Sequence, residues 1–133
     1  MNRCDRSTTR DLEAGVQRMF NQVDPLLGKH FATLRDGFLD LPSRQNKAPG
    51  GYCASFPVSR RAYIFMNAAG THDDVQTLLH EGGHAFHYLE SARQPLVWNL
   101  NGPMEFCEVA SMGMELLAAP LSGAESRRFL LRG

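Results

Sequence analysis

The pentapeptide His80-Glu81-Gly82-Gly83-His84 constrains this chain more than any other stretch. It has the pattern H-E-x-x-H and lies inside a segment, 71–91, whose apolar spacing predicts an amphipathic helix. On a helix, residues four positions apart share one face, so the two imidazoles can reach a single ion. Glu81 directly follows the first histidine, where its carboxylate can take a proton from a water molecule on that ion. The pattern predicts a zinc site that hydrolyses an amide bond.

Local signals on both sides of the motif support this helix. Thr71 is a favourable N-cap, Asp74 completes the pattern of a capping box, and Gln94-Pro95 marks the end of the helix. The apolar residues of one side are Val75, Leu78, Leu79, Ala85, Phe86 and Leu89. Each glycine inside a helix costs about 1 kcal/mol relative to alanine. The pair Gly82-Gly83 therefore predicts that another backbone or a substrate approaches the helix closely.

A third histidine on this segment, His87, does not fit as a ligand. In a straight helix it lies roughly 10 Å along the axis from His80, too far to share a small ion. The metzincin pattern needs glycine at position 87 and histidine at position 90, and this chain has His87 and Glu90. We interpret His87 as a residue that supports a ligand or faces the substrate, or else as a solvated histidine.

Composition limits the class of protein. The chain has 133 residues, enough for one compact domain, and its 14 basic and 14 acidic residues cancel. This balance gives no reason to expect nucleic acid or an anionic membrane as a partner. The cysteines are Cys4, Cys53 and Cys107, an odd number without C-x-x-C spacing, which favours reduced thiols. Residues 1–10 lack the apolar stretch of a secretion signal, so we expect a cytoplasmic protein.

The first part of the chain, 1–42, is predicted to be helical. Apolar residues three to four positions apart indicate an amphipathic helix over 8–23. Asp24-Pro25 resembles an N-cap followed by proline at the first helical position, so a second helix is expected from there to about Leu39. Leu41-Pro42 should end it.

Residues 43–70 are predicted to form a loop and two short strands. The strand candidates are 52–56 and 60–66, the second rich in β-branched and aromatic residues. If the edge of this small sheet is open, its backbone can pair with an extended peptide. The predicted substrate-binding residues are Ile64, Phe65, Met66 and Asn67. An ordinary edge strand is an equally good interpretation.

After the metal helix, residues 103–133 are predicted to be helical again. Pro103 suits a first helical position, the helix should extend to Leu117, and Ala119-Pro120 should stop it before a further helix begins at 124. The expected fold is mainly α, of the α+β class with a short two-stranded sheet, and forms a single unit over 1–133. The metal helix should pack on the downstream helix that carries glutamates.

That downstream helix is the expected source of a third ligand, because a catalytic zinc commonly takes three protein ligands and one water. Glu105 and Glu108 are one turn apart and can face the metal helix together, one as ligand and one holding a ligand histidine. Spacing does not rank these two. Glu115 lies two turns farther and suits the role less. His30 and His72 are poor candidates because of their positions in the predicted helices.

Five segments together resemble the catalytic core of the M3 family of zinc metallopeptidases, in particular the oligoendopeptidase F type. They are Lys47-Ala-Pro-Gly-Gly-Tyr-Cys53, Ile64-Phe-Met-Asn67, Gly70-Thr-His-Asp-Asp-Val75, His80-Glu-Gly-Gly-His-Ala-Phe-His87 and Pro103-Met-Glu-Phe-Cys-Glu-Val-Ala-Ser111. The similarity extends from about residue 24 onward and is far more specific than H-E-x-x-H alone. It implies a mostly helical, zincin-like core with a deep channel that admits short peptides rather than folded proteins.

The resemblance also implies roles for single residues. His80 and His84 would bind one Zn²⁺ per chain, with Glu108 as the third ligand and Glu105 as a residue supporting the ligands. Glu81 would be the general base that activates the zinc-bound water. The expected function is a zinc-dependent metalloendopeptidase that cleaves oligopeptides.

The same resemblance predicts that this chain is a fragment. Members of the family are several times longer, and the tyrosine and histidine donors that stabilise the oxyanion come from a segment downstream of the third ligand. This sequence ends at Gly133 and lacks such a segment. We therefore expect exposed apolar helix faces and self-association. The alternatives to a working peptidase core are a catalytically silent zinc-binding module and a helical interaction domain.

Overall fold

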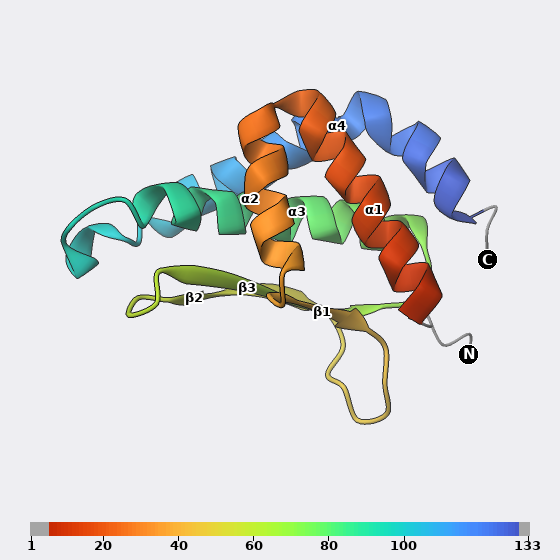
Figure 1. Ribbon diagram of the computed structural model, residues 1–133, viewed down its shortest axis with the longest axis horizontal. Helices are drawn as coiled ribbons and strands as arrows, with labels where there is room; N and C mark the ends of the chain where they lie inside the picture. Colours follow the sequence, from red (N-terminus) through yellow and green to blue (C-terminus); the bar gives the residue numbers. More distant parts are fainter. Residues whose placement is uncertain (1–5, 131–133) are drawn as a thin grey trace.

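The computed structural model describes residues 6–130 and has two layers, with helices covering one face of a small sheet (Figure 1). Its elements are α1 (Arg6–Val23), α2 (Pro25–Arg35), β1 (Leu39–Pro42), β2 (Gly51–Phe56), β3 (Arg61–Ala68), α3 (His72–Ser91), the 3₁₀ turn η1 (Val97–Asn99) and α4 (Met104–Leu130). The predicted fold class, mainly helical with a small sheet, is confirmed.

The sheet has three strands in the order β1-β3-β2, one more than predicted. β1 runs parallel to β3, and β2 runs antiparallel to it. The prediction of a helix reaching Leu39 was wrong because α2 ends at Arg35 and Gly37 takes a positive φ of 92°. The chain then turns onto β3, where the Phe38 carbonyl accepts a hydrogen bond from the Ile64 amide at 3.0 Å.

β3 alternates between two environments along its length. Ala62, Ile64, Met66 and Ala68 are buried beneath the helices, whereas the residues between them face the other side of the sheet. This side-chain alternation fixes the register of the central strand.

α3 is the central helix, and the predicted N-terminal signals are confirmed. Thr71 is its N-cap and forms a capping box with Asp74. The Asp74 carboxylate accepts hydrogen bonds from three backbone amides, those of Ala69 (3.0 Å), Gly70 (2.6 Å) and Thr71 (2.8 Å). These bonds connect the end of β3 to the start of α3. The apolar side predicted for the helix is buried in the core, with Leu89 only partly covered.

α4 differs from the prediction because it continues through Pro120 to Leu130. Proline removes one hydrogen bond from a helix interior and usually ends or bends the helix. Here contacts with α1 hold the following turns in place: Arg18 donates two hydrogen bonds to the buried Glu125, at 3.2 and 2.7 Å. Tertiary packing therefore outweighs the local signal to stop.

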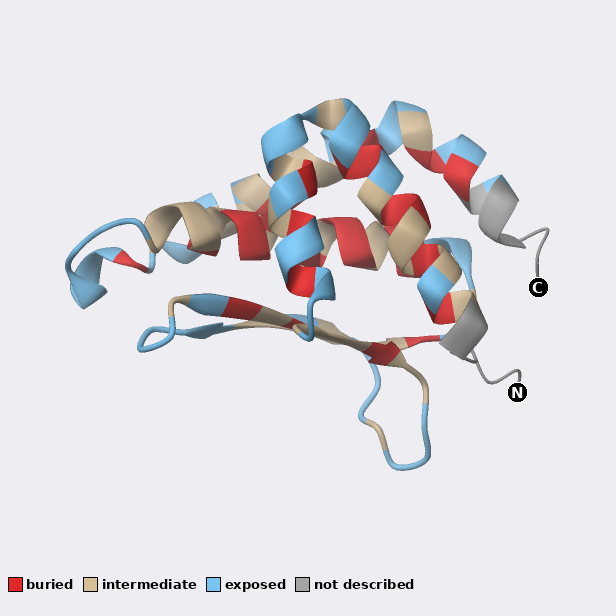
Figure 2. Cartoon of the chain, viewed as in Figure 1, coloured by how far each residue is buried: buried red, intermediate tan, exposed pale blue. Residues whose placement is uncertain are grey.

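The outer surface of α4 between Met104 and Leu117 is largely apolar, unlike that of a usual surface helix. Its large exposed side chains are Met104, Phe106, Val109, Met112, Leu116 and Leu117. Figure 2 shows exposed stretches in pale blue along α4 and along the connection that precedes it. None of the described helices is both long and apolar enough to span a membrane.

Candidate metal centre

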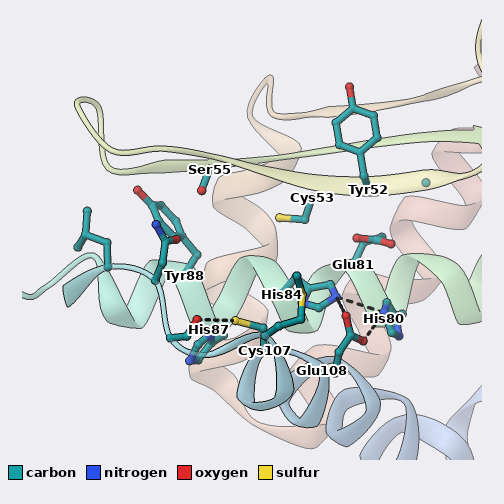
Figure 3. A pocket seen from close by; sticks show the side chains of 15 residues that line it. Tyr52, Cys53, Ser55, His80, Glu81, His84, His87, Tyr88, Cys107 and Glu108 are labelled. Carbon is teal, nitrogen blue, oxygen red and sulfur yellow. Dashed lines mark hydrogen bonds and ion pairs between the residues drawn. The ribbon is translucent and has the colours of Figure 1, made fainter. Parts of the chain in front are cut away.

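Three side chains from two helices converge on one point. His80 and His84 come from α3, and Glu108 comes from α4 (Figure 3). The two Nε2 atoms are 3.2 Å apart, and the two carboxylate oxygens of Glu108 lie 3.5 Å from them, Oε2 from His80 and Oε1 from His84. Among the residues that the structure describes, this is the group of three that could hold a metal ion.

The donor atoms of the three residues are close enough together to bind one zinc ion. Two atoms bound to a tetrahedral zinc at about 2.0–2.1 Å are about 3.3 Å apart. The separation of the two Nε2 atoms, 3.2 Å, lies close to this value, and each of them has one Glu108 oxygen 3.5 Å away. Two imidazoles with a carboxylate are also a known ligand set for catalytic zinc. The residues present therefore fit a zinc ion and leave a fourth position for water.

Two neighbouring side chains orient the ligands. Glu115 accepts a hydrogen bond from Nδ1 of His80 at 2.6 Å, which places the proton on Nδ1 and leaves the Nε2 lone pair directed at the triangle. The hydroxyl of the buried Ser111 donates to Glu108 Oε2 at 3.2 Å. Burial lowers the pKa of His84, which favours the neutral imidazole that binds metals.

Glu81 lies beside the triangle rather than in it. Its side chain is only 8% exposed, and burial raises the pKa of its carboxyl group. A nearby His80 and a hydrogen bond from the Cys53 backbone act in the opposite direction on this pKa. The contact with Cys53 shows that Glu81 lies next to β2, at the edge of the sheet.

A pocket of about 380 Å³ opens over the triangle between α3, β2 and the start of α4. Its wall on α3 includes His80, Glu81 and His84, and its opposite wall includes Cys53 and Ser55 of β2 (Figure 3). A second hollow of about 250 Å³ adjoins His80 and Glu81 on the other side and is lined by Gln76, Thr77 and Glu115. The ligand triangle thus lies beside two adjoining hollows, which share His80 and Glu81, and the larger of them is bounded by β2.

The glycine pair explains how α4 comes close enough to supply Glu108. A Cβ atom added to Gly83 would lie 2.5 Å from Ser111 Cα and 2.8 Å from the Ala110 carbonyl oxygen. The predicted close approach of another backbone is therefore confirmed, and that backbone is α4. A Cβ on Gly82 would instead meet the ring of Phe20 at 2.9 Å.

The prediction that Glu105 supports the ligands is corrected. Glu105 is exposed on α4, and the carboxylate that holds His80 is that of Glu115. His87 lines the pocket, with its ring 3.3 Å from where a Gly102 Cβ would be. It therefore belongs to the pocket wall, in keeping with the substrate-facing interpretation.

The predicted substrate-binding stretch Ile64–Asn67 is also corrected. β3 is the central strand: Ile64 and Phe65 pair with β1, and the same two residues with Met66 pair with β2. The Asn67 amide donates to the Gly50 carbonyl at 3.1 Å. The backbone of this stretch is already used within the sheet. The strand at the edge of the sheet, beside the pocket, is β2.

Comparison with known proteins agrees with this geometry. Oligoendopeptidase F, chromosomal, of Lactococcus lactis subsp. cremoris is 31% identical over 105 residues, which are 75% of this chain and 17% of that protein. The structure of PZ peptidase A with inhibitor 2 matches with a TM-score of 0.80 and 28% identity, over 90% of this chain and 22% of that one. The chain spans about a fifth of the length of these relatives. The sequence profile of Peptidase family M3 matches residues 18–123, and the chain therefore belongs to this family.

Proposed function

We propose that this chain is the catalytic core of a zinc-dependent endopeptidase that cleaves short peptides. The observation that carries the proposal is the triangle of His80, His84 and Glu108, in which the two Nε2 atoms are 3.2 Å apart, close to the edge of a tetrahedral zinc site, and each has a Glu108 oxygen 3.5 Å away. The similarity to two peptidases supports the reaction class. A zinc ion in this position supplies Lewis acidity, which lowers the pKa of a water molecule and polarises a peptide carbonyl.

Glu81 is the proposed general base. It is on the same helix as the histidines, lines both hollows and is buried between α3 and β2. From there its carboxylate takes a proton from the attacking water and returns it to the leaving amine. The Nε2 atoms of both histidines are directed at the triangle and Nδ1 of His80 donates to Glu115, which leaves Glu81 as the better placed proton acceptor.

The edge of β2 is the proposed docking strand for the substrate backbone. An extended peptide can add to an exposed sheet edge through main-chain hydrogen bonds. The Cys53 backbone already bonds to Glu81, so this edge of β2 faces the pocket. A peptide paired there passes directly over the ligand triangle. The pocket volume of about 380 Å³ suits a few residues of an extended chain rather than a folded domain.

Zinc content and one substitution test the proposal. Protein purified without added zinc is expected to contain close to one zinc per chain. Glu81→Gln is expected to keep the zinc and to lose hydrolysis of quenched fluorescent peptides, because glutamine cannot accept the proton. Glu105→Gln, an exposed glutamate of the neighbouring helix, is the matched control and is expected to behave as the parent.

Each contrary outcome has a definite meaning. A chain without zinc would remove the metal site and leave a helical interaction domain. Equal hydrolysis by the parent and Glu81→Gln would remove the role of this carboxylate. A zinc-loaded parent that cleaves nothing would leave a catalytically silent zinc-binding module.

A further inference from the structure

Tyr88 lies one helical turn beyond His84 on the same side of α3. Its side chain is only 5% exposed and lines the same pocket as the three proposed ligands. Figure 3 shows Tyr88 on the opposite side of His84 from His80 and Glu81, extending from α3 toward β2. It is the last of the α3 side chains that line the pocket.

The hydroxyl group of Tyr88 is buried, and no described residue forms a hydrogen bond with it. Buried polar groups in native proteins nearly always have a partner, because an unpaired group loses its hydration without compensation. Phenylalanine would fill the same space without this loss. A hydroxyl at this position therefore points to a partner other than the described residues.

The spacing along the helix indicates which part of a substrate reaches Tyr88. Four residues of helix separate it from His84, a rise of about 6 Å. An extended peptide advances about 3.3 Å per residue, so this rise corresponds to about two residues. A peptide that lies between α3 and β2 with its scissile carbonyl at the ligand triangle brings the oxygen atoms of its second residue to Tyr88.

The wall next to Tyr88 is suited to admitting such a ligand. Leu100, Asn101 and Gly102 line the same pocket, and Gly102 lies against the ring of His87, the residue before Tyr88. These three residues belong to an irregular connection rather than to a helix or strand. Leu100 is buried in the core, but Asn101 is exposed and Gly102 is half-buried, so a shift of these two residues would uncover the phenol when a peptide enters.

We propose that Tyr88 is a substrate-binding residue whose hydroxyl donates a hydrogen bond to an acceptor oxygen of the peptide two residues from the scissile bond. This inference rests on the proposed peptidase function. The acceptor is either a main-chain carbonyl or a terminal carboxylate, and both offer the same oxygen chemistry to a phenol. If the acceptor is the terminal carboxylate, the enzyme would prefer peptides that end two residues from the scissile bond.

The test is calorimetric binding to the zinc-loaded full chain, with Tyr88→Phe compared with the parent. The probes are alanyl dipeptides that carry a hydroxamate at one end, and they are made in both chain directions. The other end of each probe is a carboxylate, a carboxamide or a methyl group. Tyr63→Phe, the same change on the opposite face of the sheet, is the matched control. Loss of the bond should weaken the two acceptor-bearing probes about 3- to 10-fold and leave the methyl probe unchanged.

The stability of the two proteins without a probe separates a binding role from a structural one. Because the hydroxyl has no partner among the described residues, Tyr88→Phe should melt at or above the temperature of the parent and keep its zinc affinity. A lower melting temperature would reveal a partner within the folded protein, such as a fixed water, and would overturn the inference.

The remaining outcomes are equally decisive. A larger loss for the carboxylate probe than for the carboxamide identifies the terminal carboxylate as the partner, and equal losses identify the carbonyl. Equal binding of all probes by Tyr88→Phe and the parent overturns the inference while the proposed function stands. A zinc-loaded parent that binds no hydroxamate overturns both.

Discussion

α3 and α4 both supply ligands to the proposed metal site, yet they are supported very differently. α3 packs against β2, β3, α1, α2 and α4, and most of its residues are buried or partly buried. α4 packs mainly against α3 and α1 and exposes large apolar side chains elsewhere. The imidazoles are thus placed by an element surrounded on all sides, and the carboxylate by an element held from one side. The geometry of the site depends on the contact between these two helices.

The contact at Gly83 should give the largest effect. In Gly83→Ala the new methyl group meets the backbone of α4 at 2.5 Å, so the helices must separate and carry Glu108 away from the histidines. We expect a loss of about 2–4 kcal/mol in the free energy of unfolding and the loss of tight zinc binding, measured by denaturation and metal titration.

Gly113→Ala is the control on the other helix. A Cβ at Gly113 meets nothing within 4 Å among the described atoms, so alanine should raise stability by about 0.5–1 kcal/mol through its helix propensity. If Gly83→Ala folded and bound zinc as well as Gly113→Ala, the two helices would not need their close contact.

Substitution of Glu108, the proposed ligand on α4, should give the second-largest effect. Glu108→Ala removes one of three proposed ligands, and we expect zinc affinity to fall by more than about 100-fold, beyond what loss of a supporting residue causes. Glu105→Ala, one turn away on the exposed surface of the same helix, should bind zinc as the parent does. Competition titrations with a chelator measure both affinities. If Glu105→Ala lost zinc affinity and Glu108→Ala kept it, Glu105 would be the third ligand.

A smaller effect is expected at the contact that orients His80. Glu115→Gln keeps the shape of the side chain but removes the charge that holds the imidazole proton on Nδ1. Zinc affinity should fall by about 10- to 100-fold, the range found for residues that hold a ligand histidine. Unchanged affinity would mean that His80 is oriented by packing alone.

The smallest effect belongs to the exposed face of α4. Leu116 is 75% exposed, so Leu116→Lys should change the free energy of unfolding by no more than about 0.5 kcal/mol and should reduce self-association in sedimentation experiments. Leu79→Ala, in the buried side of α3, should cost about 2–5 kcal/mol. If Leu116→Lys and Leu79→Ala lowered the free energy of unfolding by similar amounts, α4 would be as fully packed as α3.

The elements that could be predicted from the sequence are those specified by neighbouring residues. α1, the start of α2 at Pro25, and α3 were predicted because caps and apolar spacing act over a few positions. β1 was missed because four residues carry little pattern and their parallel partner, β3, is more than twenty positions away. The continuation of α4 past Pro120 depends on Arg18 of α1, which no local pattern reveals.

The candidate site likewise has residues that the local sequence predicts and residues whose roles depend on how distant elements pack. The positions of His80, Glu81 and His84 follow from helical spacing within one segment. Glu115 was ranked too low because its distance was counted from Glu108 along one helix. α4 runs antiparallel to α3, with Ser111 against Gly83, so the next turn of α4 brings Glu115 to the preceding turn of α3 and hence to His80. The edge position of β2 likewise required the strand order.

The bonds of Asp74 have a consequence for how the pocket can open. Its carboxylate accepts hydrogen bonds from three consecutive backbone amides between β3 and α3, and so connects the end of the strand to the first turn of the helix. These bonds restrict motion between the sheet and the histidine-bearing helix, so a peptide docked on β2 and the proposed general base, Glu81, would move as one rigid body. Any widening of the pocket would therefore come from movement of its opposite wall, which is formed by α4 and the connection before it.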